Sequence, residues 1–78
     1  MKHTAYRLGS GRHLYRGKEV EVAYHVSAGY YGRYQTMRRG FSSLKLAKEA
    51  IDRACEVRGI DSFMTEEQTK AYILEYKD

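Results

Sequence analysis

Arginine and tyrosine side chains gather in the first half of the chain, where together they could contact a polyanion. Residues 1–40 carry eight Lys or Arg against two Glu, a charge of +6, whereas residues 41–78 carry six against eight, a charge of −2. Six of the eight tyrosines also lie in the first half. Basic side chains attract phosphates, and aromatic rings offer faces on which bases stack. We therefore expect a binding protein whose first candidate partner is nucleic acid, with DNA favoured.

The residue types that could support catalysis or metal binding are few and poorly spaced. His3, His13, His25 and Cys55 are separated by ten, twelve and thirty positions, which matches no compact zinc-ligand pattern. Cys55 falls on the apolar side of a predicted helix, where a buried, inert thiol is expected. Gly9-Ser10-Gly11 lacks the lysine of a phosphate-binding loop. The sequence thus predicts no enzyme and no cofactor or metal.

Three segments of the first half have the pattern of β-strands. Residues 19–26 alternate between apolar and polar side chains, which indicates a half-buried strand. Residues 12–16 form a shorter strand that a turn at Arg16-Gly17-Lys18 closes, and residues 31–38, rich in Tyr, form a third. Residues 2–8 could add an edge strand. Gly9-Ser10-Gly11 breaks the chain after this segment, so the sequence does not decide whether the strand forms. The expected product is an antiparallel meander.

Two helices follow the strands. Ser42 is placed to cap the first helix, with Phe41 and Leu46 spaced as a hydrophobic staple, and Gly59 ends it. Inside it, apolar residues recur at helical spacing: Leu44, Ala47, Ile51, Ala54 and Cys55. The second helix begins at a capping box over residues 65–68 and places Thr69, Tyr72, Ile73 and Tyr76 along one face.

These elements predict a single small α+β domain over residues 1–78. A three-stranded antiparallel sheet (about 12–39) packs on one α-helix (about 43–58), and a second, C-terminal helix covers about 65–76. One cysteine allows no internal disulfide, and no apolar run approaches the length that spans a bilayer. We expect a cytoplasmic protein without a membrane partner.

The helix should cover the side of the sheet that carries Val20, which leaves Glu19 and Glu21 on the open face. One alternative is that these glutamates pair with Arg33 across the strands and neutralise part of that face. Nucleic-acid or partner contacts are therefore expected at the edges, loops and nearby tyrosines. The candidate residues are Arg12, Arg16, Lys18, Tyr30, Tyr31, Arg33, Tyr34, Arg38 and Arg39.

Residues 13–59 also resemble a known family of DNA-binding domains. The segments 13–17 (His-Leu-Tyr-Arg-Gly) and 40–42 (Gly-Phe-Ser), the helix alanines and Arg58-Gly59 are similar to the plant ethylene-response-factor type. The resemblance implies a three-stranded sheet packed on one helix that reads the DNA major groove through the sheet; integrase arm domains are similar. The resemblance also implies that Arg16 and Arg33 contact DNA. The chain has no Trp, which that family places on its DNA-facing strands.

A second class of function uses the same tyrosines and arginines against a protein. Tyr and Arg are enriched at protein interfaces because both bury a large area while keeping a polar end. The chain also looks like short phage-encoded proteins, so it could inhibit a host defence complex, as an anti-CRISPR protein does. An exposed edge strand or the Tyr72 and Tyr76 face could instead pair two copies into a homodimer.

Overall fold

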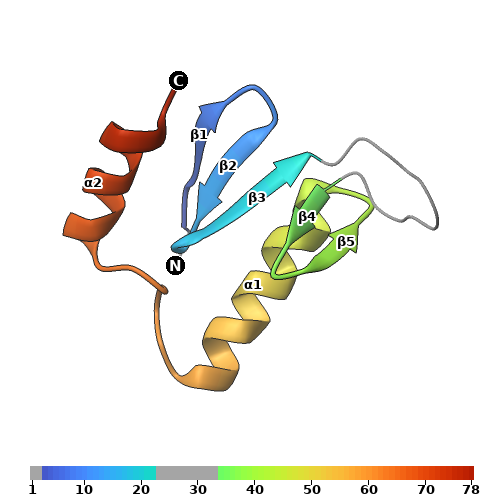
Figure 1. The fold of residues 1–78 in the computed structure, drawn as a ribbon. Coiled ribbons are helices and arrows are strands. Elements are labelled where there is room, and N and C mark those ends of the chain that lie inside the picture. Colours follow the sequence, from blue (N-terminus) through green and yellow to red (C-terminus); the bar gives the residue numbers. More distant parts are fainter. Residues whose placement is uncertain (1–2, 23–33) are drawn as a thin grey trace.

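The computed structural model describes residues 3–22 and 34–78 and confirms an α+β fold with an antiparallel sheet and two helices. In order, the elements are β1 (Ala5–Gly9), β2 (Arg12–Tyr15), β3 (Lys18–Val22), β4 (Tyr34–Thr36), β5 (Arg39–Phe41), α1 (Leu44–Arg58) and α2 (Glu66–Tyr76) (Figure 1). The strands lie side by side in sequence order, each antiparallel to the next. The meander is confirmed, but the sheet has five strands where the sequence predicted three.

Two tight turns account for the additional strands. Met37 and Arg38 have φ of 51° and 63°, so the chain reverses between β4 and β5 inside the segment predicted as one strand. Such a turn usually contains Asn or Gly, and the pair Met-Arg gave no sign of it. At the other end of the sheet, Gly11 with φ of 74° turns the chain from β1 into β2. Residues 5–9 therefore form the edge strand that the sequence did not decide.

Helix α1 ends at the predicted residue, Arg58, but it begins at Leu44, one residue later than predicted. The hydroxyl oxygen of Ser43, not Ser42, accepts a hydrogen bond from the backbone N–H of Leu46 at 3.2 Å. The predicted staple between Phe41 and Leu46 is therefore wrong, and Leu46 is 43% exposed. One residue of shift turns a helical side chain by about 100°. Gly59 ends the helix with φ of 68°, as predicted.

The main core lies between α1 and one face of the sheet. Ala47, Ile51 and Cys55 of α1 are fully buried against Tyr15 and Val20. The four-residue spacing of these helix positions keeps them on one side of α1. The prediction that the first helix covers the Val20 face is confirmed.

The second helix lies beside β1, on the opposite side of the sheet from α1 (Figure 1). Its predicted capping box is present between Thr65 and Gln68. The Tyr72 hydroxyl donates to a Glu19 carboxylate oxygen at 3.4 Å, and Leu14, which pairs with Glu19 across β2 and β3, is 1% exposed. The expectation that the Glu19 face lies open is therefore wrong at its β1 end, because α2 packs there.

Candidate nucleic-acid interface

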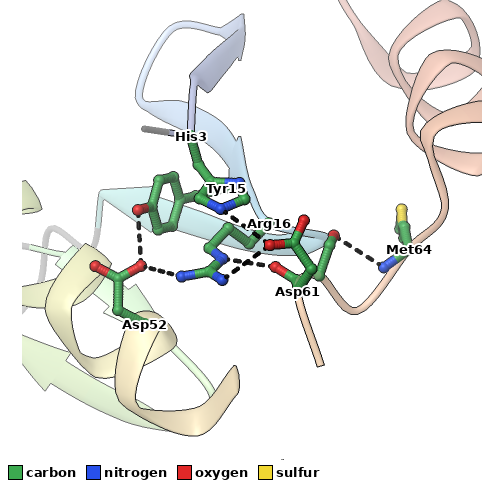
Figure 2. Close-up of polar contacts among 7 residues, drawn as sticks. His3, Tyr15, Arg16, Asp52, Asp61 and Met64 are labelled. Atoms are coloured by element: carbon green, nitrogen blue, oxygen red, sulfur yellow. Dashed lines mark hydrogen bonds and ion pairs between the residues drawn. The ribbon is translucent and has the colours of Figure 1, made fainter. Parts of the chain in front are cut away.

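Arg16, predicted to contact a partner, is engaged inside the molecule. It occupies the tight turn between β2 and β3 with φ of 49°, and its side chain is 14% exposed. Its guanidinium donates to the Asp52 carboxylate at 2.7 Å and to the backbone carbonyl of Asp61 at 2.8 Å (Figure 2). Arg16 thereby links β2 to α1 and to the segment between the helices. Its charge is compensated by carboxylates of the same chain.

Tyr15 completes this cluster from the neighbouring position. Its hydroxyl donates to the same Asp52 oxygen at 2.7 Å, and the His3 ring lies edge-on to the Tyr15 ring (Figure 2). Burial, followed by the hydrogen bond to Asp52 and the charge of that carboxylate, raises the pKa of Tyr15 to about 12. Burial is the largest single effect and would lower the pKa of Arg16, but the hydrogen bond to Asp52 and the electrostatic effects of Cys55, Asp52 and Tyr15 together outweigh it, so the pKa is raised. Both groups thus keep their protons at neutral pH, and the cluster holds elements together.

Arg12 is engaged in a similar way on the other face of the sheet. Its guanidinium contacts the Glu19 carboxylate at 3.3 Å, the Tyr76 carbonyl at 3.0 Å and the Asp78 carboxylate at 3.4 Å. A cation at the carboxyl end of a helix also interacts favourably with the helix dipole. Arg12 therefore fixes α2 to the sheet. The alternative pairing of Glu19 or Glu21 with Arg33 falls on a residue outside the described part of the chain.

Lys18 and Tyr34, two further candidates, have different surroundings. The Lys18 ammonium lies 4.6 Å from the centroid of the Phe63 ring, and the Arg58 guanidinium lies 5.5 Å from the same centroid. Two cations beside one ring make a small basic and aromatic cluster at the end of α1. Tyr34 is half-buried and packs on the main core. Tyr30, Tyr31 and Arg33 lie outside the described residues.

Arg38, in the turn between β4 and β5, and Arg39, the first residue of β5, are both exposed, as their predicted role requires. Arg39 borders a groove of about 420 Å³ between this hairpin and α1, which we call the basic groove. Its charged lining is Arg39, Arg53, Arg58 and Glu49, and its apolar lining is Met37, Phe41, Leu46, Ala50, Ala54 and Val57. Among the described residues, three positive charges against one negative give this lining a net charge of +2.

The arginines of the basic groove differ from Arg12 and Arg16 in their ion pairs. All ten Asp and Glu of the chain lie within residues 3–22 and 34–78. Among those residues, the ion pairs involve only Arg12, Arg16 and His3 as cations. Within the part of the chain that the structure describes, Arg39, Arg53 and Arg58 thus have no carboxylate partner, and their charge is available to a ligand.

Sequence reasoning missed Arg53 and Arg58 because it assigned one apolar side to the helix and treated the rest as solvated. A second stripe was present at helical spacing in Leu46, Ala50, Ala54 and Val57. Leu46 is 43% and Val57 is 78% exposed. The arginines flank this stripe, so the signal was the coincidence of a second apolar stripe with nearby basic residues.

The groups considered for catalysis show no shared site in the described residues. Burial, followed by the charges of Arg7 and Lys48, lowers the pKa of His13, so that its ring favours the neutral form. Cys55 is fully buried in the main core. Residues 3–22 and 34–78 contain no cluster of three or more His, Cys, Asp or Glu side chains that could hold a metal ion. No helix among these residues is both long and apolar enough to cross a membrane.

Comparison with known proteins adds no relative to this description. No protein-family model, curated protein or solved structure matches the chain. The resemblance to the ethylene-response-factor type of domain therefore stays a prediction, with the difference that the sheet here has five strands.

Proposed function

We propose that this chain is a small non-enzymatic module that binds nucleic acid through the basic groove. One observation carries the proposal: Arg39, Arg53 and Arg58 converge on one groove without a carboxylate partner among the described residues. Phosphate contacts supply most of the affinity of such modules, and they require cations that are not already neutralised. The exposed Arg38 at one end and Lys18, beside Arg58 at Phe63, extend the basic surface.

The proposal assigns different roles to the arginines that the sequence treated as one set. Arg12 and Arg16 hold α2, α1 and the segment between them in place. Arg38 and Arg39 remain candidate contacts, joined by Arg53 and Arg58 of α1. The acidic side chains Asp52 and Glu56 line a separate hollow on α1, and Glu49 borders both hollows. A phosphate backbone should therefore follow the hairpin side of α1.

Fluorescence anisotropy with labelled DNA at several salt concentrations tests this assignment. Replacing Arg53 and Arg58 with Ala should weaken binding at low salt, and each lost phosphate contact should reduce the slope of log K against log salt by about 0.7–0.9. Replacing Arg38 and Arg39 with Ala should act in the same way. Arg7→Ala removes an exposed arginine of β1 outside the groove and is the matched control. If Arg7→Ala weakens binding as much as the groove variants do, the groove is not the site.

A gain of affinity provides a second test, which cannot result from damage to the fold. Glu49 is the single carboxylate of the groove lining, and it should repel a bound phosphate. Glu49→Gln should therefore tighten binding several-fold at low salt, and high salt should remove the gain. Glu56→Gln removes the same charge from the neighbouring hollow and should have a smaller effect. Equal effects of the two variants would mean that only the net charge matters.

Inhibition of a protein partner, as by an anti-CRISPR protein, is the second candidate function. The exposed aliphatic side chains of Leu46 and Val57 favour it, because aliphatic surface at a groove is typical of protein interfaces. Binding to such a partner should survive salt that releases DNA. Val57→Gln should weaken binding to a protein partner and leave the affinity for phosphate nearly unchanged. Absence of DNA binding at low salt would favour this second candidate.

A further inference from the structure

We propose that the basic groove takes a single strand in preference to a duplex, with a base stacked at Phe41 and Arg39. This inference rests on the proposed function and specifies the form of its ligand. The groove carries three arginines, and six of the ten described residues that line it are apolar. A regular duplex presents charged phosphates and sugars to a protein surface and keeps its bases stacked inside. An unpaired strand can turn its bases toward the apolar lining while its phosphates reach the arginines.

Phe41 provides the aromatic ring that this arrangement requires. It ends β5 and is half-buried, because one part of the ring packs against the main core while another lines the groove. The packing holds the ring in place before any ligand arrives, so little conformational entropy is lost on binding. Among residues 3–22 and 34–78, Phe41 is the only aromatic residue in the lining of the basic groove.

Arg39 makes Phe41 a stacking platform with a charge beside it. Its guanidinium carbon lies 5.2 Å from the centroid of the Phe41 ring, so the planar cation and the ring are already associated. Proteins that bind single strands stack unpaired bases on aromatic rings and on guanidinium planes. A base at this position can extend the stack, and the Arg39 charge is then close to the phosphate of the same nucleotide.

The two arginines of α1 are spaced to hold more than one phosphate. Arg58 follows Arg53 by five positions, which places their backbones about 7.5 Å apart along the helix axis. Both border the same groove as Arg39, so the three guanidinium groups can contact successive phosphates of an extended strand. The short strand β5, with three residues, bounds the other side of the groove and adds Phe41 to its lining.

The experiment compares a short oligothymidylate with a duplex of the same length by anisotropy at low salt. We expect the single strand to bind at least about tenfold more tightly. Phe41→Leu keeps aliphatic packing but removes the ring, and it should weaken single-strand binding roughly tenfold and duplex binding much less. Phe41→Tyr retains a ring face and is the matched control. A 2-aminopurine base in the strand should change fluorescence on binding to the wild type and to Phe41→Tyr only.

A second variant keeps the inference testable if Phe41→Leu does not fold. Arg39 is exposed, so Arg39→Lys should fold normally, keep the charge and lose the planar stacking group. It should weaken single-strand binding more than it weakens duplex binding. Equal or tighter duplex binding, or equal losses for both ligands in these variants, would overturn this inference and leave the proposed function standing. No binding of either ligand at low salt would overturn both.

Discussion

Replacing Asp52 with Ala tests whether the cluster of Tyr15, Arg16 and Asp52 holds the segment between the two helices in place. In the structure, the Asp52 carboxylate accepts hydrogen bonds from the Tyr15 hydroxyl and from Arg16, both at 2.7 Å. Arg16 in turn donates to the Asp61 carbonyl, which lies between α1 and α2. Without Asp52, the largely buried Arg16 guanidinium has a weaker partner in Asp61, at 3.7 Å. The variant should therefore lose stability and loosen this segment.

The expected loss follows from the contacts. A hydrogen bond that involves a charged group contributes about 1.5–3 kcal/mol. The Asp52 side chain is 44% exposed, so water replaces part of what is lost, and the sum of two bonds must be reduced accordingly. Alanine also favours a helix over aspartate by about 0.6 kcal/mol. The net cost should be about 2 kcal/mol, which lowers the melting temperature of a domain of this size by roughly 10 °C.

Urea unfolding followed by circular dichroism measures this loss. Glu56→Ala is the matched control, because it removes a carboxylate one helical turn later that takes part in no ion pair among the described residues. Glu56→Ala should be within about 0.5 kcal/mol of the wild type. If Asp52→Ala were equally mild, the cluster would not stabilise the fold. Arg16 would then be free to contact a partner, as the sequence first predicted.

Two further predictions concern pH and the turns. The pKa of Tyr15 is raised to about 12, above the value near 10 of an unfolded tyrosine, so its contribution to stability should be complete below pH ~10 and disappear as pH rises through about 12. Urea unfolding across this interval should show a smaller loss for Tyr15→Phe than for the wild type, and equal losses would contradict the assignment. Gly17→Ala should cost at least ~1 kcal/mol more than Gly59→Ala in urea midpoints. Both glycines have positive φ, but an added Cβ at Gly17 would lie 2.6 Å from the Met64 backbone nitrogen, whereas Gly59 faces open space.

Local signals in the sequence were sufficient for the helices and for most of the core. Ala47, Ile51 and Cys55 share one helix face by spacing alone, and Gly59 and the Thr65 capping box mark helix ends chemically. The number of strands was not accessible in this way, because Met37 and Arg38 adopt a left-handed turn that their types disfavour. Pairing across the whole sheet, rather than local preference, must stabilise that turn.

The candidate site was harder to predict, because it depends on which charges the fold neutralises. The sequence gives no reason to separate Arg12 and Arg16 from Arg38 and Arg39. In the structure, however, Arg12 forms an ion pair with Glu19, and Arg16 forms one with Asp52, which is 36 positions away. No local pattern predicts contacts at such separation. Arg53 was visible only as one member of a mixed charged side of α1. The basic groove became apparent once the β4–β5 hairpin lay beside that helix.

The complete burial of Cys55 gives the chain a chemical reporter of its own opening. It is the only cysteine, and its side chain is enclosed between α1 and the sheet. A thiol reagent can reach it only when α1 separates from the sheet, so the labelling rate under native conditions reports the free energy of that separation without any engineered probe. A ligand in the basic groove, on another side of the same helix, should slow labelling in proportion to its occupancy. Such protection would reveal binding even to an unlabelled oligonucleotide or protein.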